Sequence, residues 1–107
     1  MCKVRQNLKA IIYDKRGRIL SIGQNSYTKT HTLQFKHAVK VGKPYKTVLH
    51  AEIDAIIRCR NLDKAHTIKV FRYNRQGKYM LAKPCVVCIS AIKEAGIPNI
   101  EWTVTEV

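Results

Sequence analysis

The chain has 107 residues, a formal net charge of +13 and an apolar fraction of 46%. This length predicts one domain, residues 1–107, and the apolar content argues against intrinsic disorder. No stretch approaches the roughly 18 continuous apolar residues of a membrane span, and the N-terminus has no apolar segment typical of a signal peptide. We therefore expect a cytoplasmic protein without membrane contact, whose four cysteines are thiols or metal ligands rather than disulfides.

The positive charge is unevenly distributed along the chain. From Lys15 to Ala51 there are eight Lys or Arg residues and no Asp or Glu. Clustered positive charge attracts anions, so this stretch predicts a phosphate-bearing partner, although small proteins often have a basic surface without one. Charge alone does not separate a mononucleotide from a polymer.

The first half of the chain begins with two apolar, β-branched runs, NLKAIIYD and ILSIGQN, around the turn sequence KRGR. This pattern predicts a β-hairpin. From Gln24 to Leu49 the pattern is lost over a length that favours a functional loop, with a short helix possible around Leu33 to Val41.

The second half alternates helical and strand patterns. HAEIDAIIRCRNL and CVVCISAIKEAG predict helices, the second of which begins after Pro84 and ends at Gly96. TIKVFRY and NIEWTV predict strands. The order strand, strand, helix, strand, helix, strand predicts a layered α/β fold with a mixed sheet of about four strands.

Two cysteines open the second predicted helix, in the sequence KPCVVC. Cys85 and Cys88 are three residues apart and share one helical face, and a helix N-terminus stabilises the thiolate that binds metals. Such a pair can be a redox pair, which usually follows an early strand of the fold. It can also be part of a structural zinc site, which usually has a second close pair of ligands. The sequence has neither context.

His50 lies at the start of the first predicted helix, with Glu52 two residues further on. Side chains two apart do not share a helical face, so we expect Glu52 to lie over what a metal holds rather than to bind the metal. His50, Cys85 and Cys88 suit zinc.

Three protein ligands with an open position are typical of catalytic zinc, and four are typical of structural zinc. Cys59 is too far along the helix from His50 to be the fourth ligand. The other candidates, none favoured by spacing, are Cys2, His31, His37 and His66.

Together, His-Ala-Glu at 50–52 and Pro-Cys-Val-Val-Cys at 84–88 resemble the zinc-dependent cytidine deaminase-like superfamily, whose signature is H-x-E followed by P-C-x-x-C. The resemblance covers most of the chain and implies a three-layer fold, here a minimal core with two zinc-bearing helices. Histidine at position 50 is similar to the dCMP, tRNA adenosine and polynucleotide-editing deaminases. Small free-nucleoside deaminases commonly carry cysteine there.

The resemblance implies a zinc-dependent hydrolytic deaminase, and we expect its substrate to be a cytosine nucleotide of the dCMP or CMP type. His50, Cys85 and Cys88 would hold Zn²⁺, which lowers the pKa of a bound water. Glu52 would take a proton from that water and pass protons to the ring nitrogen and to the departing amine, which leaves as ammonia.

The resemblance also implies substrate contacts at four positions. Asn25 matches a residue that contacts the sugar, but a turn residue after a strand is a nearly equal interpretation. Lys83 stands where family members often carry Ser, Thr or Glu, and it would either meet a phosphate or face solvent. Ala51 and Pro84 belong to the two motifs themselves.

Two alternatives stay open. The first is a deaminase of cytosine or adenine in single-stranded DNA or RNA, favoured by the charge but opposed by the few aromatic residues outside the predicted sheet. These are Tyr27, Phe35, Tyr45 and Tyr79. The second is a non-catalytic nucleic-acid-binding zinc module, which would not need Glu52. A minimal core leaves surface uncovered, so we also expect a homo-oligomer.

Overall fold

The computed structural model describes residues 7–26, 29–43 and 49–106. Its sheet has five strands, which are β1 (Asn7–Tyr13), β2 (Ile19–Gln24), β3 (Thr67–Tyr73), β4 (Tyr79–Met80) and β5 (Asn99–Trp102). Its helices are α1 (Thr32–Lys40), α2 (Ala51–Arg58) and α3 (Val86–Ala95), with a short 3₁₀ helix, η1, at Leu62–Lys64. None of the helices in these described ranges has the length and apolarity that a membrane crossing requires.

The sheet is mixed. β1 lies between β2 and β3 and is antiparallel to both. The other edge of β3 pairs with β5, in parallel, and near its end with β4, antiparallel. The α/β prediction is thus confirmed, with five strands rather than about four. The extra strand is β4, whose two residues are too short to give a sequence pattern, and it contains Tyr79, which we had expected outside the sheet.

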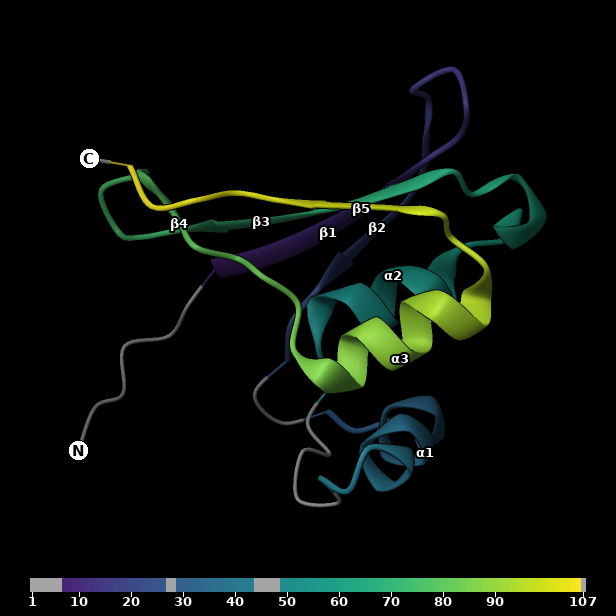
Figure 1. The fold of residues 1–107 in the computed structure, drawn as a ribbon. Helices are drawn as coiled ribbons and strands as arrows, with labels where there is room; N and C mark the ends of the chain where they lie inside the picture. Colours follow the sequence, from purple (N-terminus) through teal and green to yellow (C-terminus); the bar gives the residue numbers. More distant parts are fainter. Residues whose placement is uncertain (1–6, 27–28, 44–48, 107) are drawn as a thin grey trace.

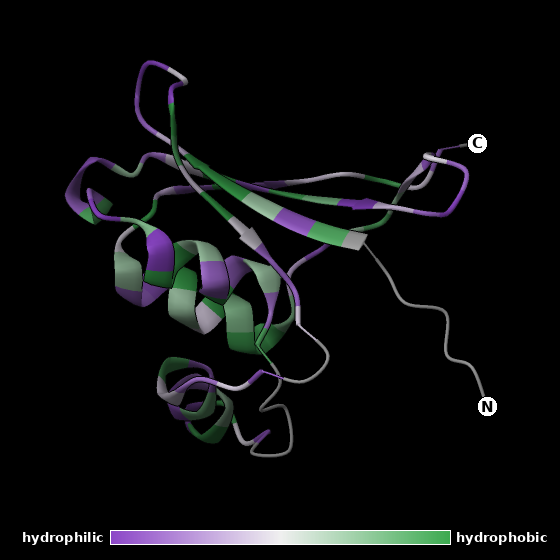
Figure 2. Cartoon of the chain, turned by 180° about the vertical axis from the view of Figure 1, so that it is seen from behind, coloured by the Kyte–Doolittle hydropathy of each residue, from purple (hydrophilic) through white to green (hydrophobic). Residues whose placement is uncertain are grey.

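The layers are the sheet, the α2–α3 pair and α1. In the views of Figure 1 and Figure 2, α2 and α3 lie against one face of the sheet and α1 lies beyond them. Their buried side chains form one core with β1 and β3, which includes Ala10, Ile12, Ile53, Ile68, Val87 and Ile92. No helix of the described residues lies on the opposite face of the sheet.

Both predicted helices are present, but only α3 ends where the sequence predicts. α3 stops at Gly96, which has a φ of +79°, as the glycine followed by proline predicts. α2 ends at Arg58, earlier than the predicted Leu62, because Cys59 adopts an extended conformation with ψ of 114°. The chain then turns through η1 toward β3.

β2 crosses the first turns of α2 at very close range. A Cβ atom added to Gly23 would lie 2.3 Å from the carbonyl oxygen of Ala51 and 2.3 Å from the amide nitrogen of Ala55. The Ser21 hydroxyl donates to the Ala55 carbonyl at 2.7 Å, and an Asp54 carboxylate oxygen accepts from the Gln24 amide at 3.0 Å. Only glycine permits this contact between the two backbones.

We therefore expect Gly23→Ala to lower the free energy of unfolding by about 3 kcal/mol or more, because the added methyl meets backbone atoms that have no room to move. Urea denaturation of the variant and the wild type measures this. Gly77→Ala is the control, since Gly77 has a φ of +80° and open space around it. It should cost only about 1–2 kcal/mol of backbone strain. Equal losses in the two variants would contradict the close-packing argument.

Candidate active site

Three potential metal ligands meet where α2 and α3 begin. His50 is the N-cap residue of α2, Cys85 is the N-cap residue of α3, and Cys88 lies in the first turn of α3. The His50 Nδ1 atom is 3.2 Å from Cys88 Sγ and 3.5 Å from Cys85 Sγ. All three ligand atoms lie within 4.8 Å of one another. The structure thus brings together the three residues that the two motifs predict.

The chemistry of these donors fits zinc. A hydrogen bond from the Cys88 thiol lowers the pKa of Cys85 to about 3, and His50 adds to this effect while burial opposes it. The same hydrogen bond, together with burial, raises the pKa of Cys88. One thiolate is therefore available at neutral pH, and two sulfurs with one imidazole nitrogen make a ligand set that zinc prefers. His50, Cys85 and Cys88 are positioned to hold this ion.

The alternative fourth ligands that the structure describes make their contacts elsewhere. His31 caps α1, where its Nδ1 accepts from the Leu33 amide at 3.0 Å. His66 contacts Thr67 and Asn99, and Cys59 ends α2. Among the described His, Cys, Asp and Glu side chains, the only group of three potential ligands is the one at the helix starts. Cys2 lies outside the described residues.

Glu52 lies in the first turn of α2 and is only 6% exposed. Burial raises the pKa of its carboxyl group. A hydrogen bond from its own backbone amide, the charge of His50 and a hydrogen bond with Cys88 act in the opposite direction. The carboxyl group thus lies next to Cys88, outside the group of three candidate ligands, and its role over a bound water stays a prediction.

α1 supports the metal ligand His50, and the sequence did not reveal this role of the helix. The side chain of Gln34 is completely buried, and its Oε1 accepts from the backbone amide of His50 at 3.1 Å. The spacing of the buried residues Gln34, His37 and Ala38 is that of one helical face, but two of them are polar. A search for apolar periodicity therefore misses this buried face.

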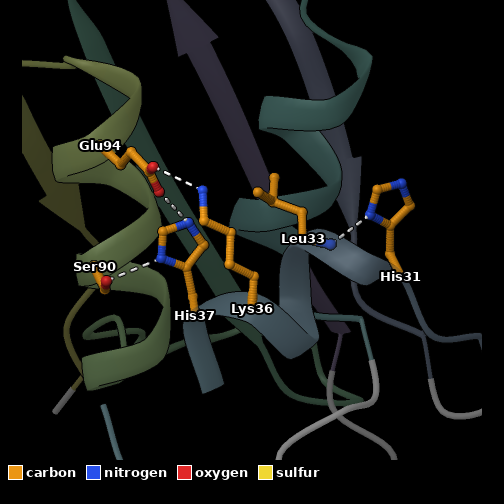
Figure 3. A network of polar contacts seen from close by, with 6 residues as sticks. All are labelled: His31, Leu33, Lys36, His37, Ser90 and Glu94. Atoms are coloured by element: carbon orange, nitrogen blue, oxygen red, sulfur yellow. Dashed lines mark hydrogen bonds and ion pairs between the residues drawn. The ribbon is translucent and has the colours of Figure 1, made fainter. Parts of the chain in front are cut away.

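Ion pairs and hydrogen bonds attach α1 to α3 (Figure 3). The Glu94 carboxylate is 2.8 Å from both Lys36 Nζ and His37 Nε2, and the Ser90 hydroxyl is 2.9 Å from His37 Nδ1. Burial lowers the pKa of His37 more than Glu94 raises it, so His37 is neutral at pH 7. Its Nε2–H then donates to Glu94 while Nδ1 accepts from Ser90. α3, which carries Cys88, is thereby tied to α1, whose Gln34 accepts from the His50 backbone amide.

A hollow of about 400 Å³ lies between α2 and the segment that begins in β2. Its lining residues are Ile22, Gln24, Asn25, Ser26, Lys29, Leu49, Asp54 and Arg58. The Ser26 amide donates to the Leu49 carbonyl and the Leu49 amide donates to the Lys29 carbonyl, each at 2.9 Å. These bonds hold the segment after β2 next to the residue that precedes His50. Arg58 is paired with Asp54 at 3.0 Å.

The four expected substrate contacts have different surroundings. Asn25 is half-buried, and its Oδ1 accepts from the Leu8 amide at 3.3 Å, which ties the end of β2 to β1. Lys83 is exposed, whereas Ala51 and Pro84 are buried. Asn25 therefore has a structural role at the end of β2, and its contact with a sugar stays a prediction.

Comparison with family models gives a match over residues 3–104 to the cytidine and deoxycytidylate deaminase zinc-binding region. The matched range contains β1 to β5, all three helices and both motifs. A search of curated proteins found no significant match.

We expect one zinc ion per chain, bound by His50, Cys85 and Cys88. His50→Ala or Cys88→Ser should abolish stoichiometric binding, because each leaves only two protein ligands. Elemental analysis and competition with a chelator measure this. Cys59→Ser is the matched control and should keep one zinc per chain, since Cys59 lies at the opposite end of α2. Retention of tightly bound zinc by both His50→Ala and Cys88→Ser would refute this ligand set.

Proposed function

The chain belongs to the family of cytidine and deoxycytidylate deaminases with a zinc-binding region, and we propose that it is a hydrolytic deaminase of a cytosine nucleotide of the dCMP or CMP type. The reaction replaces the exocyclic amine of the base by a carbonyl oxygen and releases ammonia. Membership of this family supports a zinc-dependent deaminase. The nucleotide substrate is our proposal.

The observation that carries the proposal is the buried Glu52 carboxyl group next to three metal ligands. His50, Cys85 and Cys88 would hold zinc, which supplies, when bound, a positive charge that makes water acidic near neutral pH. Glu52 accepts a proton from the attacking water and donates it to the ring nitrogen; it then takes the remaining proton from the hydroxyl group formed on the base carbon and donates it to the departing amine. A site that only stabilised the fold would not need this buried carboxyl group.

Glu52→Gln should therefore keep zinc and fold but lose nearly all turnover. General acid–base catalysis contributes typically 10²–10⁴-fold, and a residue that serves several proton transfers should be at or above the upper end. Release of ammonia from dCMP measures the effect, and zinc content is measured on the same sample. Glu101→Gln, which changes an exposed carboxylate on β5, is the control and should keep wild-type turnover. Substantial turnover by zinc-loaded Glu52→Gln would show that the proton carrier is another group.

A nucleotide rather than a nucleoside is supported by the charge beside the site. Lys29 is exposed and lines the hollow that also contains Asn25, and its backbone pairs with Leu49. We propose that Asn25 contacts the sugar and that Lys29 or Lys83 contacts the phosphate, while Ala51 and Pro84 line the base. Long basic side chains near the entrance would also raise the rate of capture of an anionic substrate.

Lys29→Ala should raise the KM for dCMP by about tenfold or more, since a hydrogen bond to a charged group is lost. The KM for cytidine should change little, because that substrate has no phosphate. A change confined to KM indicates the loss of binding that is equal in ground state and transition state. Lys15→Ala, in the turn between β1 and β2, is the control. An equal effect of Lys29→Ala on both substrates would contradict the phosphate contact.

A single-stranded polynucleotide is the second candidate substrate, and the net charge of +13 favours it. Assays with cytosine- and adenine-containing oligonucleotides separate the candidates. Turnover of an oligonucleotide without turnover of dCMP would replace the mononucleotide proposal. A zinc-loaded chain that deaminates none of these would instead be a binding module.

A further inference from the structure

The sheet has a face that points away from α2 and α3. Ala10 and Ile12 of β1 and Ile68 and Val70 of β3 are buried in or beside the core. Side chains alternate along a strand, so their neighbours lie on the opposite face. We call this the open face, and its residues are Lys9, Ile11, Tyr13, Ile22, Gln24, Lys69, Phe71, Tyr73 and Glu101. Among the described residues, no helix lies over it in Figure 1 or Figure 2.

Aromatic rings and lysines are interleaved on the open face. The Lys69 ammonium lies 5.1 Å from the centroid of the Phe71 ring, and Lys9 is the cross-strand partner of Phe71. The Phe71 ring is 6.3 Å from that of Tyr79, which is 46% exposed at the adjacent edge of the sheet. Positive groups thus flank accessible rings.

Each end of the open face has a hollow that joins a tyrosine to a lysine. A smaller one of about 140 Å³ is lined by Leu8, Lys9, Gln24, Asn25 and Tyr73. A larger one of about 420 Å³ is lined by Tyr13, Asp14, Lys15, Gly17, His66, Thr67, Lys69 and Glu101. Asn25 lines the smaller hollow as well as the hollow lined by Leu49 and Asp54, so the two hollows meet at the end of β2.

The turns at both ends of the face add positive charge. Lys15, Arg16 and Arg18 are exposed in the β1–β2 turn, and Arg75 and Lys78 are exposed in the β3–β4 turn. The three acids nearby are Asp14, Glu101 and Glu106, and the Glu106 carboxylate accepts from the Tyr79 backbone amide. Asp14 accepts hydrogen bonds from the backbone amides of Arg16 and Arg18, which occupy one of its oxygens. The face as a whole is therefore cationic.

We propose that the open face binds single-stranded nucleic acid, with bases stacked on Tyr73, Phe71 and Tyr79 and phosphates beside Lys9 and Lys69. Stacking on aromatic rings and neutralisation by lysines are the two means by which proteins bind single strands without sequence preference. A duplex would not offer the base faces. A second copy of this chain would bring two cationic faces together, and the repulsion opposes that pairing. This site is separate from the metal ligands, and the proposal does not depend on which substrate is deaminated.

The test is fluorescence anisotropy of a labelled single-stranded DNA of about 15 nucleotides with the zinc-loaded protein. Tyr79→Ala should weaken binding about 5- to 150-fold, which corresponds to the roughly 1–3 kcal/mol lost with one stacked base. Tyr79→Phe keeps the ring and should keep the affinity. Lys69→Gln should reduce the salt dependence, because each lost phosphate contact flattens the slope of log K against log salt by about 0.7.

Lys93→Gln is the matched charge control, since Lys93 is exposed on α3, in the helix layer. It should leave the salt slope almost unchanged, and zinc content reports whether each variant is folded. Three results would overturn the proposal. They are no oligonucleotide binding, equal losses in Lys93→Gln and Lys69→Gln, or wild-type affinity in Tyr79→Ala. Sedimentation of the same samples detects self-association, and a dimer that Tyr79→Ala dissociates without weaker DNA binding would assign the face to a second copy.

Discussion

The close packing of β2 on α2 determines where the active site lies. At Gly23 the two backbones meet without an intervening side chain, and Ala51 and Ala55 provide the matching small residues on the helix. The first turn of α2 is thereby fixed against the sheet. His50 and Glu52 lie at this turn, so the contact of Gly23 with Ala51 and Ala55 fixes their positions although neither residue takes part in it.

Two further elements complete the site from other directions. α3 places Cys85 and Cys88 next to His50. In α1, the side-chain oxygen of Gln34 accepts a hydrogen bond from the His50 backbone amide. The ion pair of Glu94 with Lys36 and its hydrogen bond with His37 join α1 to α3, so the elements around the ligands are connected to one another as well. The site is thus held by a ring of contacts among β2, α1, α2 and α3 rather than by any one loop.

The sequence predicted the parts of this arrangement that depend on local patterns. The hairpin and both ligand-bearing helices follow from periodicity and helix ends, and the convergence of His50, Cys85 and Cys88 follows from the resemblance of the two motifs to the deaminase signature. Gln34 could not be predicted, because its role depends on the docking of a polar helix face far from the motifs. The open face was also missed. Counting only aromatic residues outside the sheet is justified when helices cover both of its faces. Phe71 and Tyr73 alternate along β3 with the buried Val70, so they lie on the opposite face. None of the described helices covers that face.

The distance along the chain between the ligands has a consequence for chain entropy. His50 and Cys85 are 35 positions apart. A metal that stays bound to both residues in the unfolded chain restricts that chain in the way that a disulfide does. In the loop-closure model a cross-link over this length is worth roughly 4 kcal/mol. For a chain of this size that is a large part of the net stability, so the ion would act as a removable cross-link between α2 and α3.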